Sequence, residues 1–128
     1  ETSTLNQQQG ANLLKQMGHI YNELGKTDKG EKYIMNAFKI FEENDLMGTS
    51  DGANINFAVG SIKLKKGDKN SALKHYQRVV EIRDKIQTIR SPQGASQLDS
   101  LAKLLREMGK DDEALKTEDR ATQVRGTL

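Results

Sequence analysis

The sequence lacks cysteine and tryptophan, and it contains one proline, three tyrosines and three phenylalanines. Without cysteine the chain can form neither a disulfide bridge nor a thiolate metal site, so cysteine usage does not mark its redox compartment. No apolar run approaches the roughly 18 residues that a membrane-spanning helix needs, and no signal-peptide pattern opens the chain. From these absences we expect a cytoplasmic protein without membrane insertion.

A charge excess of either sign is also lacking. The 20 basic and 18 acidic side chains give a net charge of +2, which favours neither nucleic acid nor an anionic membrane as a partner. The six aromatic residues do not interleave with basic residues as a platform for single-stranded nucleic acid requires. The composition, 34% hydrophobic and 30% charged, is polar for a compact globule and suits an elongated array.

What the sequence does contain is a repeat of 42 residues. Residues 14–26 return as residues 56–68 and again as residues 98–110, without a gap. The columns that show this register best are Gly10/Gly52/Gly94, Ala11/Ala53/Ala95, Met17/Val59/Leu101, Ile20/Ile62/Leu104 and Gly25/Gly67/Gly109. Self-similarity at a period of about 20–50 residues indicates a stacked-repeat protein.

Each repeat has the pattern of two helices joined by a short turn. In the first helix, expected from Ala11, the apolar residues lie in one stripe along the helix. Gly25 is expected to end this helix, because glycine tolerates the left-handed C-cap conformation. The third helix is expected over residues 53–66. The loop over residues 91–94 contains Pro92, and the fifth helix is expected over residues 95–108. The pattern predicts an all-α protein of six antiparallel helices in three hairpins, whose paired helices approach closely at the small column Gly18/Gly60/Ala102.

The expected organisation follows from this pattern. Residues 1–9 are polar and predicted to be disordered or to fray, and residues 126–128 form a tail. The three repeats occupy residues 10–51, 52–93 and 94–125. Because the sequence begins with Glu1 and the repeats start almost at once, we expect a piece of a longer protein.

At these residues the chain resembles the tetratricopeptide repeat family, whose pattern is W-x2-L-G-x2-Y followed by A-x3-F. The first motif reads Leu14-x2-Met17-Gly18-x2-Tyr21, Asn56-x2-Val59-Gly60-x2-Lys63 and Leu98-x2-Leu101-Ala102-x2-Leu105 in the three repeats. The second reads Gly30-x3-Ile34, Ala72-x3-Tyr76 and Ala114-x3-Glu118. The period of 42 resembles the kinesin-light-chain type of repeat. The resemblance implies a right-handed superhelical array that binds protein in a concave groove.

Few residues invite a catalytic or metal-binding interpretation. Glu23 lies four residues after His19, but two ligands do not complete a metal site, so His19 is interpreted as groove-lining or solvated and His75 as part of a helix interface. The acidic run at residues 111–113 complements a helix N-terminus. The chain has no nucleophile motif and no phosphate-binding glycine loop. We therefore expect no catalytic residue, no metal and no cofactor, and we predict that the protein is not an enzyme.

The resemblance places partner-binding residues on the first helix of each hairpin. The residues predicted to line the groove are Asn12, Lys15, His19, Asn22, Asn54, Phe57, Ser61, Leu64, Asp99, Lys103 and Arg106. Phe57 and Leu64 lie off the buried stripe and are predicted to anchor a partner, while Lys103 and Arg106 would contact an acidic group. The basic cluster at residues 63–74 is either a solvated face or a patch for an acidic partner.

The predicted function is a protein–protein interaction scaffold that binds a peptide or a partner helix in this groove. One alternative is a sensory or regulatory module within a larger signalling protein. Another is self-association through an uncapped repeat end. The sixth helix is polar, as a terminal cap should be, whereas the N-terminal hairpin could form a homodimer through Leu13 and Tyr33.

Overall fold

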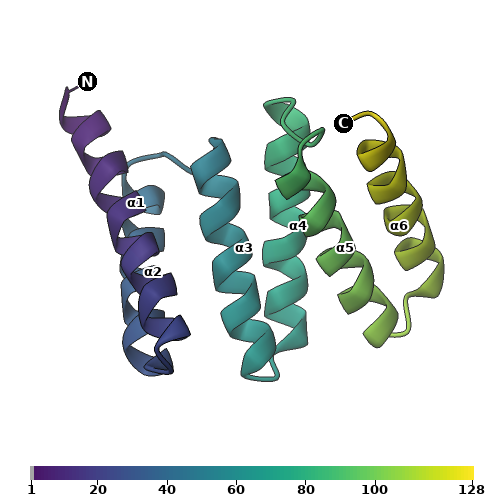
Figure 1. Cartoon of the computed structure of the whole chain (residues 1–128), viewed down its shortest axis with the longest axis horizontal. Helices are drawn as coiled ribbons and strands as arrows, with labels where there is room; N and C mark the ends of the chain where they lie inside the picture. Colours follow the sequence, from purple (N-terminus) through teal and green to yellow (C-terminus); the bar gives the residue numbers. More distant parts are fainter. Residues whose placement is uncertain (1) are drawn as a thin grey trace.

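The computed structural model describes residues 2–128, with side chains from residue 6 onward, and all its regular elements over that range are helices. They are α1 (Thr2–Glu23), α2 (Thr27–Glu43), α3 (Ser50–Lys65), α4 (Lys69–Lys85), α5 (Pro92–Glu107) and α6 (Asp111–Gly126). Each pairs with its neighbour in one row of three antiparallel hairpins, with α1 and α6 at opposite ends (Figure 1). The prediction of an all-α array of six helices is confirmed.

The start of α1 differs from the prediction. Residues 2–9, which the sequence predicts to be disordered or to fray, form the first turns of the helix, and residue 1 lies outside the described residues. This end of the helix contacts the next hairpin, because Gln8 Nε2 and Asn12 Nδ2 both donate to Asp51 Oδ2, at 3.1 and 2.8 Å. Sequence pattern alone does not reveal these contacts.

Two other first helices begin three residues earlier than the expected Ala53 and Ala95. Ser91 caps α5, since its Oγ accepts the N–H of Gly94 at 2.9 Å, and Thr49 caps α3 in the same way through Gly52. Pro92, predicted to lie in the preceding loop, occupies the first turn of α5. A proline is well tolerated there because its missing N–H would have no helical partner.

The hairpin turns repeat at one register position. Gly25, Gly67 and Gly109 adopt φ angles of 80°, 83° and 78°, which confirms the left-handed ends predicted for the first helices. The close approach within hairpins is also confirmed. A Cβ added at Gly60 would lie 2.7 Å from the Tyr76 ring, and one at Gly18 would lie 2.6 Å from Ile34 Cγ1. Alanine at either position would therefore require the facing side chain, Tyr76 or Ile34, to shift.

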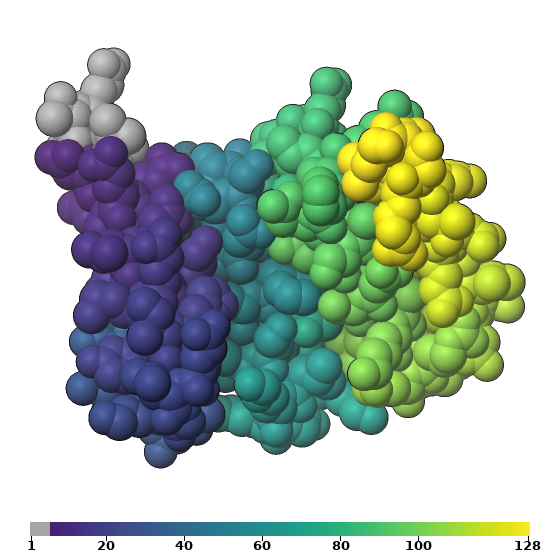
Figure 2. All heavy atoms as spheres, in the orientation of Figure 1, coloured from purple at the N-terminus to yellow at the C-terminus, as the bar shows by residue number. Residues whose placement is uncertain are grey.

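The core follows the row of hairpins. Between the first two hairpins it is built around Ile34, Phe41, Ile55 and Val59, all nearly inaccessible to solvent. Buried leucines of α5, including Leu104, continue it toward α6. The space-filling view shows the side chains closing the spaces between the ribbons from α1, in purple, to α6, in yellow (Figure 2).

Candidate partner-binding groove

A cavity of about 520 Å³ opens between the first helices of the hairpins. We call it the first-helix cavity. Its lining comes from α1, α3 and the start of α5, with one side chain from α2. The lining residues are Lys15, Gln16, His19, Asn22, Ile34, Asn54, Phe57, Ala58, Ser61, Ile62, Lys65, Gln93 and Gln97.

The structure brings together six of the residues predicted from the sequence. Lys15, His19, Asn22, Asn54, Phe57 and Ser61 line the first-helix cavity. They belong to the first and second repeats and come from α1 and α3. The predicted residues that do not line the cavity are Asn12, Leu64, Asp99, Lys103 and Arg106.

Two of those five are engaged within the last hairpin. Arg125 Nη1 donates to Asp99 Oδ2 at 2.6 Å, and Arg106 forms an ion pair with Glu118. Both pairs join α5 to α6. Arg106, which the sequence predicts to contact an acidic group of a partner, is therefore already paired with a carboxylate of its own hairpin.

The other three have different environments. Asn12 binds Asp51 at the start of α3, and its Oδ1 is buried without a hydrogen-bond partner in the described part of the chain. Leu64, predicted to anchor a partner, packs instead against the core cluster that contains Tyr76. Lys103 is exposed on α5.

Phe57 differs from the exposed anchor that the sequence suggests. Its ring stacks on Tyr76, with ring centroids 4.9 Å apart and planes 16° apart, and it packs against two core clusters. Ser61 Oγ lies 2.9 Å from the Tyr76 hydroxyl oxygen, so Tyr76 contacts both Phe57 and Ser61, which line the cavity. Phe57 is thus half-buried and contributes to packing as well as to the lining.

The electrostatic character of the first-helix cavity is positive. Its lining includes Lys15 and Lys65 and no carboxylate, and neither lysine forms an ion pair within the described residues. Burial, reinforced by the charge of Lys15, lowers the pKa of His19, while Glu23 opposes this effect. His19 is therefore neutral at pH 7 and presents a hydrogen-bonding ring beside the two cations.

Behind the cavity lies a buried arginine. Arg83 of α4 is 3% exposed, and its Nε donates to Gln97 Oε1 at 2.6 Å while Nη2 donates to Asn54 Oδ1 at 2.8 Å. Gln97 Nε2 also donates to Asn54 Oδ1, at 2.9 Å. Burial lowers the pKa of Arg83, but a guanidinium remains charged. Asn54 and Gln97, two of the amides that line the cavity, are thus held in position by a buried cation.

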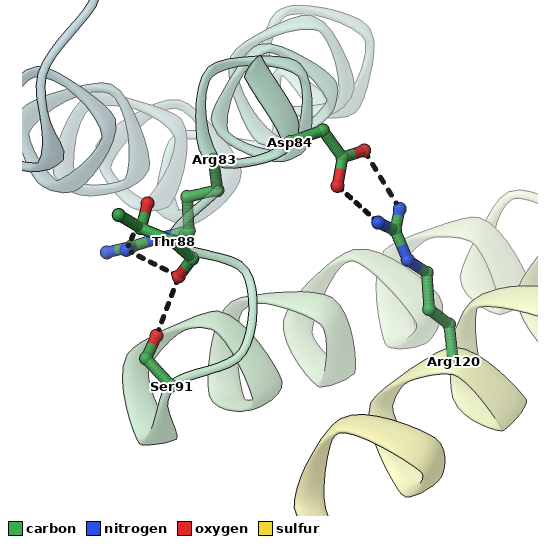
Figure 3. Close-up of polar contacts among 5 residues, drawn as sticks. All are labelled: Arg83, Asp84, Thr88, Ser91 and Arg120. Carbon is green, nitrogen blue, oxygen red and sulfur yellow. Dashed lines mark hydrogen bonds and ion pairs between the residues drawn. The ribbon is translucent and has the colours of Figure 1, made fainter. Parts of the chain in front are cut away.

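The neighbouring carboxylate does not neutralise this cation. Figure 3 shows Asp84 directed away from Arg83, toward the guanidinium of Arg120 on α6. Arg83 instead reaches the loop before α5, where Nη1 donates to the backbone oxygen of Thr88 at 3.3 Å (Figure 3). The hydrogen-bond partners of Arg83 within the described residues are all neutral oxygens.

Sequence reasoning missed this group. Arg83 occupies the column of Phe41, and Gln97 occupies the column of Ile55. In both columns a polar residue replaces an apolar residue that is buried in the preceding repeat, and the sequence shows this replacement. The contribution of Gln93 to the lining had no comparable signal, because it is a polar residue on an exposed helix face. Lys65 belongs to the basic cluster for which the sequence left open a solvated face or a patch for an acidic partner.

On the opposite side of α3, His75 lies at a helix interface. Its ring meets Phe38 edge-on, with centroids 5.7 Å apart, and its Nδ1 lies 3.1 Å from Asn56 Oδ1. Because Asn56 Nδ2 donates to the backbone oxygen of Gly52, the Asn56 oxygen faces His75 as an acceptor, so Nδ1 carries the proton. Burial and then the charges of Lys63 and Arg78 lower the pKa of His75.

Across the described residues, no cluster of three or more histidine, aspartate or glutamate side chains is placed to hold a metal ion. Over the same part of the chain, no helix combines the length and the apolar character that a membrane crossing requires.

Comparisons with known proteins agree with the repeat pattern. A family model described as tetratricopeptide repeat matches residues 11–85. The chain belongs to the tetratricopeptide repeat family. The sequence resemblance to this family is thereby confirmed, and its members are generally non-catalytic protein–protein interaction modules.

Among solved structures, the chain is similar to the crystal structure of BtubC (BKLC) from P. vanneervenii, with a TM-score of 0.82 and 24% sequence identity. The similarity covers 92% of this chain and 46% of that one, so this chain spans about half the length of BtubC. At this identity the likeness shows the fold. No curated protein matches the sequence.

Proposed function

We propose that this tetratricopeptide repeat protein is a non-enzymatic scaffold that binds an extended peptide or a partner helix in the first-helix cavity. One observation carries the proposal. The first helices of all three hairpins contribute to a single cavity, whose polar lining consists of amides, cations, a neutral histidine and a hydroxyl group. A partner that crosses the cavity would contact every hairpin of the array.

The amide side chains suit a peptide backbone. Gln16, Asn22, Asn54, Gln93 and Gln97 line the cavity from three helices. A carboxamide can donate to a backbone carbonyl oxygen and accept from a backbone N–H. An extended peptide presents both groups along its length and can be bound through them irrespective of its side chains.

The cations favour an acidic residue in that peptide. Lys15 on α1 and Lys65 on α3 both line the cavity, with no acidic side chain in the lining to compete for them. The residues that we propose to contact the acidic group are therefore Lys15 and Lys65 rather than Lys103 and Arg106. Another member of the basic cluster, Lys66, forms an ion pair with Glu31 at 2.5 Å.

A displayed peptide library selected against the folded chain, followed by affinity measurements on the selected peptides, tests the proposal. We expect acidic sequences, and at least tenfold weaker binding to a variant with Lys15→Glu and Lys65→Glu, since two attractive charges become repulsive. The matched control carries Lys69→Glu and Lys103→Glu, which make the same charge change at exposed positions outside the cavity. Equal loss in both variants, or binding retained by both, would refute binding in the first-helix cavity.

A further inference from the structure

The amide of Asn54 presents hydrogen-bond donors, and no acceptor, to the first-helix cavity. Its Oδ1 accepts from Arg83 Nη2 at 2.8 Å and from Gln97 Nε2 at 2.9 Å. A guanidinium can only donate, so the oxygen of Asn54 and not its nitrogen must face Arg83. The two bonds use both lone pairs of this oxygen. The NH2 group of Asn54 is therefore the part that remains for a ligand.

This NH2 group is accessible from the cavity. Within the described part of the chain, Asn12 Oδ1 is the buried side-chain atom that lacks a hydrogen-bond partner. Asn54 Nδ2 has no acceptor among the same residues either, so it is not buried. Because Asn54 lines the first-helix cavity, its NH2 group is exposed there.

The charge next to this group favours an anion. Arg83 is 3% exposed, and its hydrogen-bond partners within the described residues are neutral oxygens. The cavity lining contains no carboxylate that would neutralise it. A buried cation is weakly screened, so it makes the potential at the Asn54 amide positive. An ionised acceptor is therefore bound more strongly at this amide than a neutral carbonyl oxygen.

The first repeat contains such a contact within the chain itself. Asn12 occupies the column of Asn54, and its Nδ2 donates to the carboxylate of Asp51 at 2.8 Å. In the next repeat the column of Asp51 holds Gln93, which also lines the first-helix cavity. The described chain thus supplies a carboxylate to Asn12, whereas at the corresponding place Asn54 has a neutral side chain.

We propose that Asn54 Nδ2 binds the side-chain carboxylate of an aspartate or glutamate in the peptide, as Asn12 Nδ2 binds Asp51. This contact presupposes the peptide binding proposed for the first-helix cavity. Asn54 precedes Lys65 by about 16 Å along α3, so the two contact different acidic residues of the peptide. Arg83 is a positioning residue, because it orients the amide and contributes charge without touching the peptide.

Nuclear magnetic resonance tests the contact directly, with N-acetyl-glutamate amide as the probe. The side-chain carboxylate is the one charge of this compound, and N-acetyl-glutamine amide is its neutral counterpart. At the same millimolar concentrations, we expect the glutamate probe to shift the side-chain NH2 resonances of Asn54 and the glutamine probe to shift them much less. The loss of these resonances in Asn54→Asp assigns them. Equal shifts with both probes, or no shift with either, would overturn the proposal.

Asn54→Asp reverses the chemistry of the contact and keeps its shape. The new carboxylate still accepts from Arg83 and pairs with its charge, so stability should not fall. Affinity for an acidic peptide from the library, acetylated and amidated at its ends, should fall tenfold or more, because the NH2 group is replaced by a repelling oxygen. The matched control, Ser96→Asp, adds the same charge in the same column of the third repeat, outside the lining, and should retain the affinity.

The outcomes separate this contact from the function on which it depends. If the Lys15→Glu and Lys65→Glu variant loses the peptide but Asn54→Asp retains it, the peptide lies in the cavity and the proposed contact is wrong. If both retain it, binding in the cavity is wrong as well. A peptide that binds with a free C-terminus but not when amidated would place a terminal carboxylate in the cavity and also overturn the proposal.

Gln93→Asp copies the first repeat and tests the parallel with Asn12. The new carboxylate should accept from Asn54 Nδ2 as Asp51 accepts from Asn12 Nδ2. The Asn54 resonances should then no longer respond to N-acetyl-glutamate amide, and the affinity for the peptide should fall. Gln93→Asn, of the same size but uncharged, should retain both. An unchanged response in Gln93→Asp would refute the parallel and the proposal with it.

Discussion

The two junctions between hairpins use the same positions with opposite chemistry. At the first junction, Phe41 and Ile55 are buried in one apolar cluster. At the second, the residues of the same columns are Arg83 and Gln97, also buried but joined by a hydrogen bond of 2.6 Å. The repeat register therefore determines which positions are buried, whereas the residue type decides whether a junction is held by apolar packing or by a polar network.

The difference has an energetic meaning. Apolar burial contributes roughly 25 cal/mol per Å² without any requirement for geometry. A buried charge must recover its desolvation cost through well-formed hydrogen bonds, and such groups often contribute less to stability than apolar residues of similar size. We infer that the second junction gives up some stability to hold Asn54 and Gln97 at the wall of the first-helix cavity.

The largest expected effect comes from breaking the apolar junction. Phe41→Ala removes a ring that is 1% exposed and leaves a cavity between the first two hairpins. A buried phenylalanine truncated in this way costs about 3–5 kcal/mol. Urea unfolding followed by circular dichroism measures the change. A loss below about 1 kcal/mol would mean that the junction closes around the missing ring and that the array tolerates gaps.

Breaking the polar junction should cost less. Gln97→Leu keeps the side-chain volume close to the original but removes the oxygen that accepts from Arg83 Nε. Leaving a buried donor without its acceptor costs about 1–3 kcal/mol. The control is Gln93→Leu, which changes an exposed glutamine of the same helix. Equal stability of the two variants would show that water replaces the lost acceptor.

These two junctions also show what could be predicted from the sequence. The 42-residue repeat pattern predicted the helices, the glycine turns and the close contact at Gly60, because these features depend on residue spacing and side-chain size. The family resemblance pointed to six of the α1 and α3 residues that line the first-helix cavity, but also to Asn12 and Leu64, which do not line it. The roles of Asp99 and Arg106 could not be predicted in this way, since a charged side chain on a first helix can point to a groove or pair with its own hairpin.

The early starts of α3 and α5 were missed for a related reason. Ser91 and Pro92 read as a loop when proline is treated as a helix breaker, but together they are also a cap and a first turn. Whether these two residues form a loop or the start of a helix depends on whether the Ser91 oxygen reaches the N–H of Gly94. That contact depends in turn on how the preceding loop folds over the helix start.

Exchanging the chemistry of one junction for that of the other tests the inference about function. The variant with Arg83→Phe and Gln97→Ile copies the first junction into the second. Because the buried charge and its partner leave together, stability should be unchanged or raised by about 1 kcal/mol. Binding of a peptide selected by the native chain should weaken, since Asn54 loses both groups that hold it. Unimpaired binding would show that the polar network serves the fold alone.

The smallest expected effect is a pH dependence of folding stability, which we expect at the first junction and not at the second. His75 meets Phe38 across the first junction, and neither histidine of the chain lies at the second. Burial lowers the pKa of His75 in the folded state, with Lys63 and Arg78 adding to the effect and Glu42 opposing it. The unfolded chain therefore binds a proton more readily, and stability should fall as the pH drops below the unfolded value of about 6.5.

Urea midpoints measured between about pH 7.5 and 5.5 would record this decline. His75→Gln keeps a hydrogen-bonding side chain at the first junction but cannot titrate, so it should flatten much of the pH dependence. His19→Gln provides the comparison, because His19 also has a lowered pKa but lies on the exposed wall of the first-helix cavity. If His19→Gln flattened the curve more than His75→Gln, the acid-sensitive contact would lie at the cavity and the first junction would owe its stability to apolar packing alone.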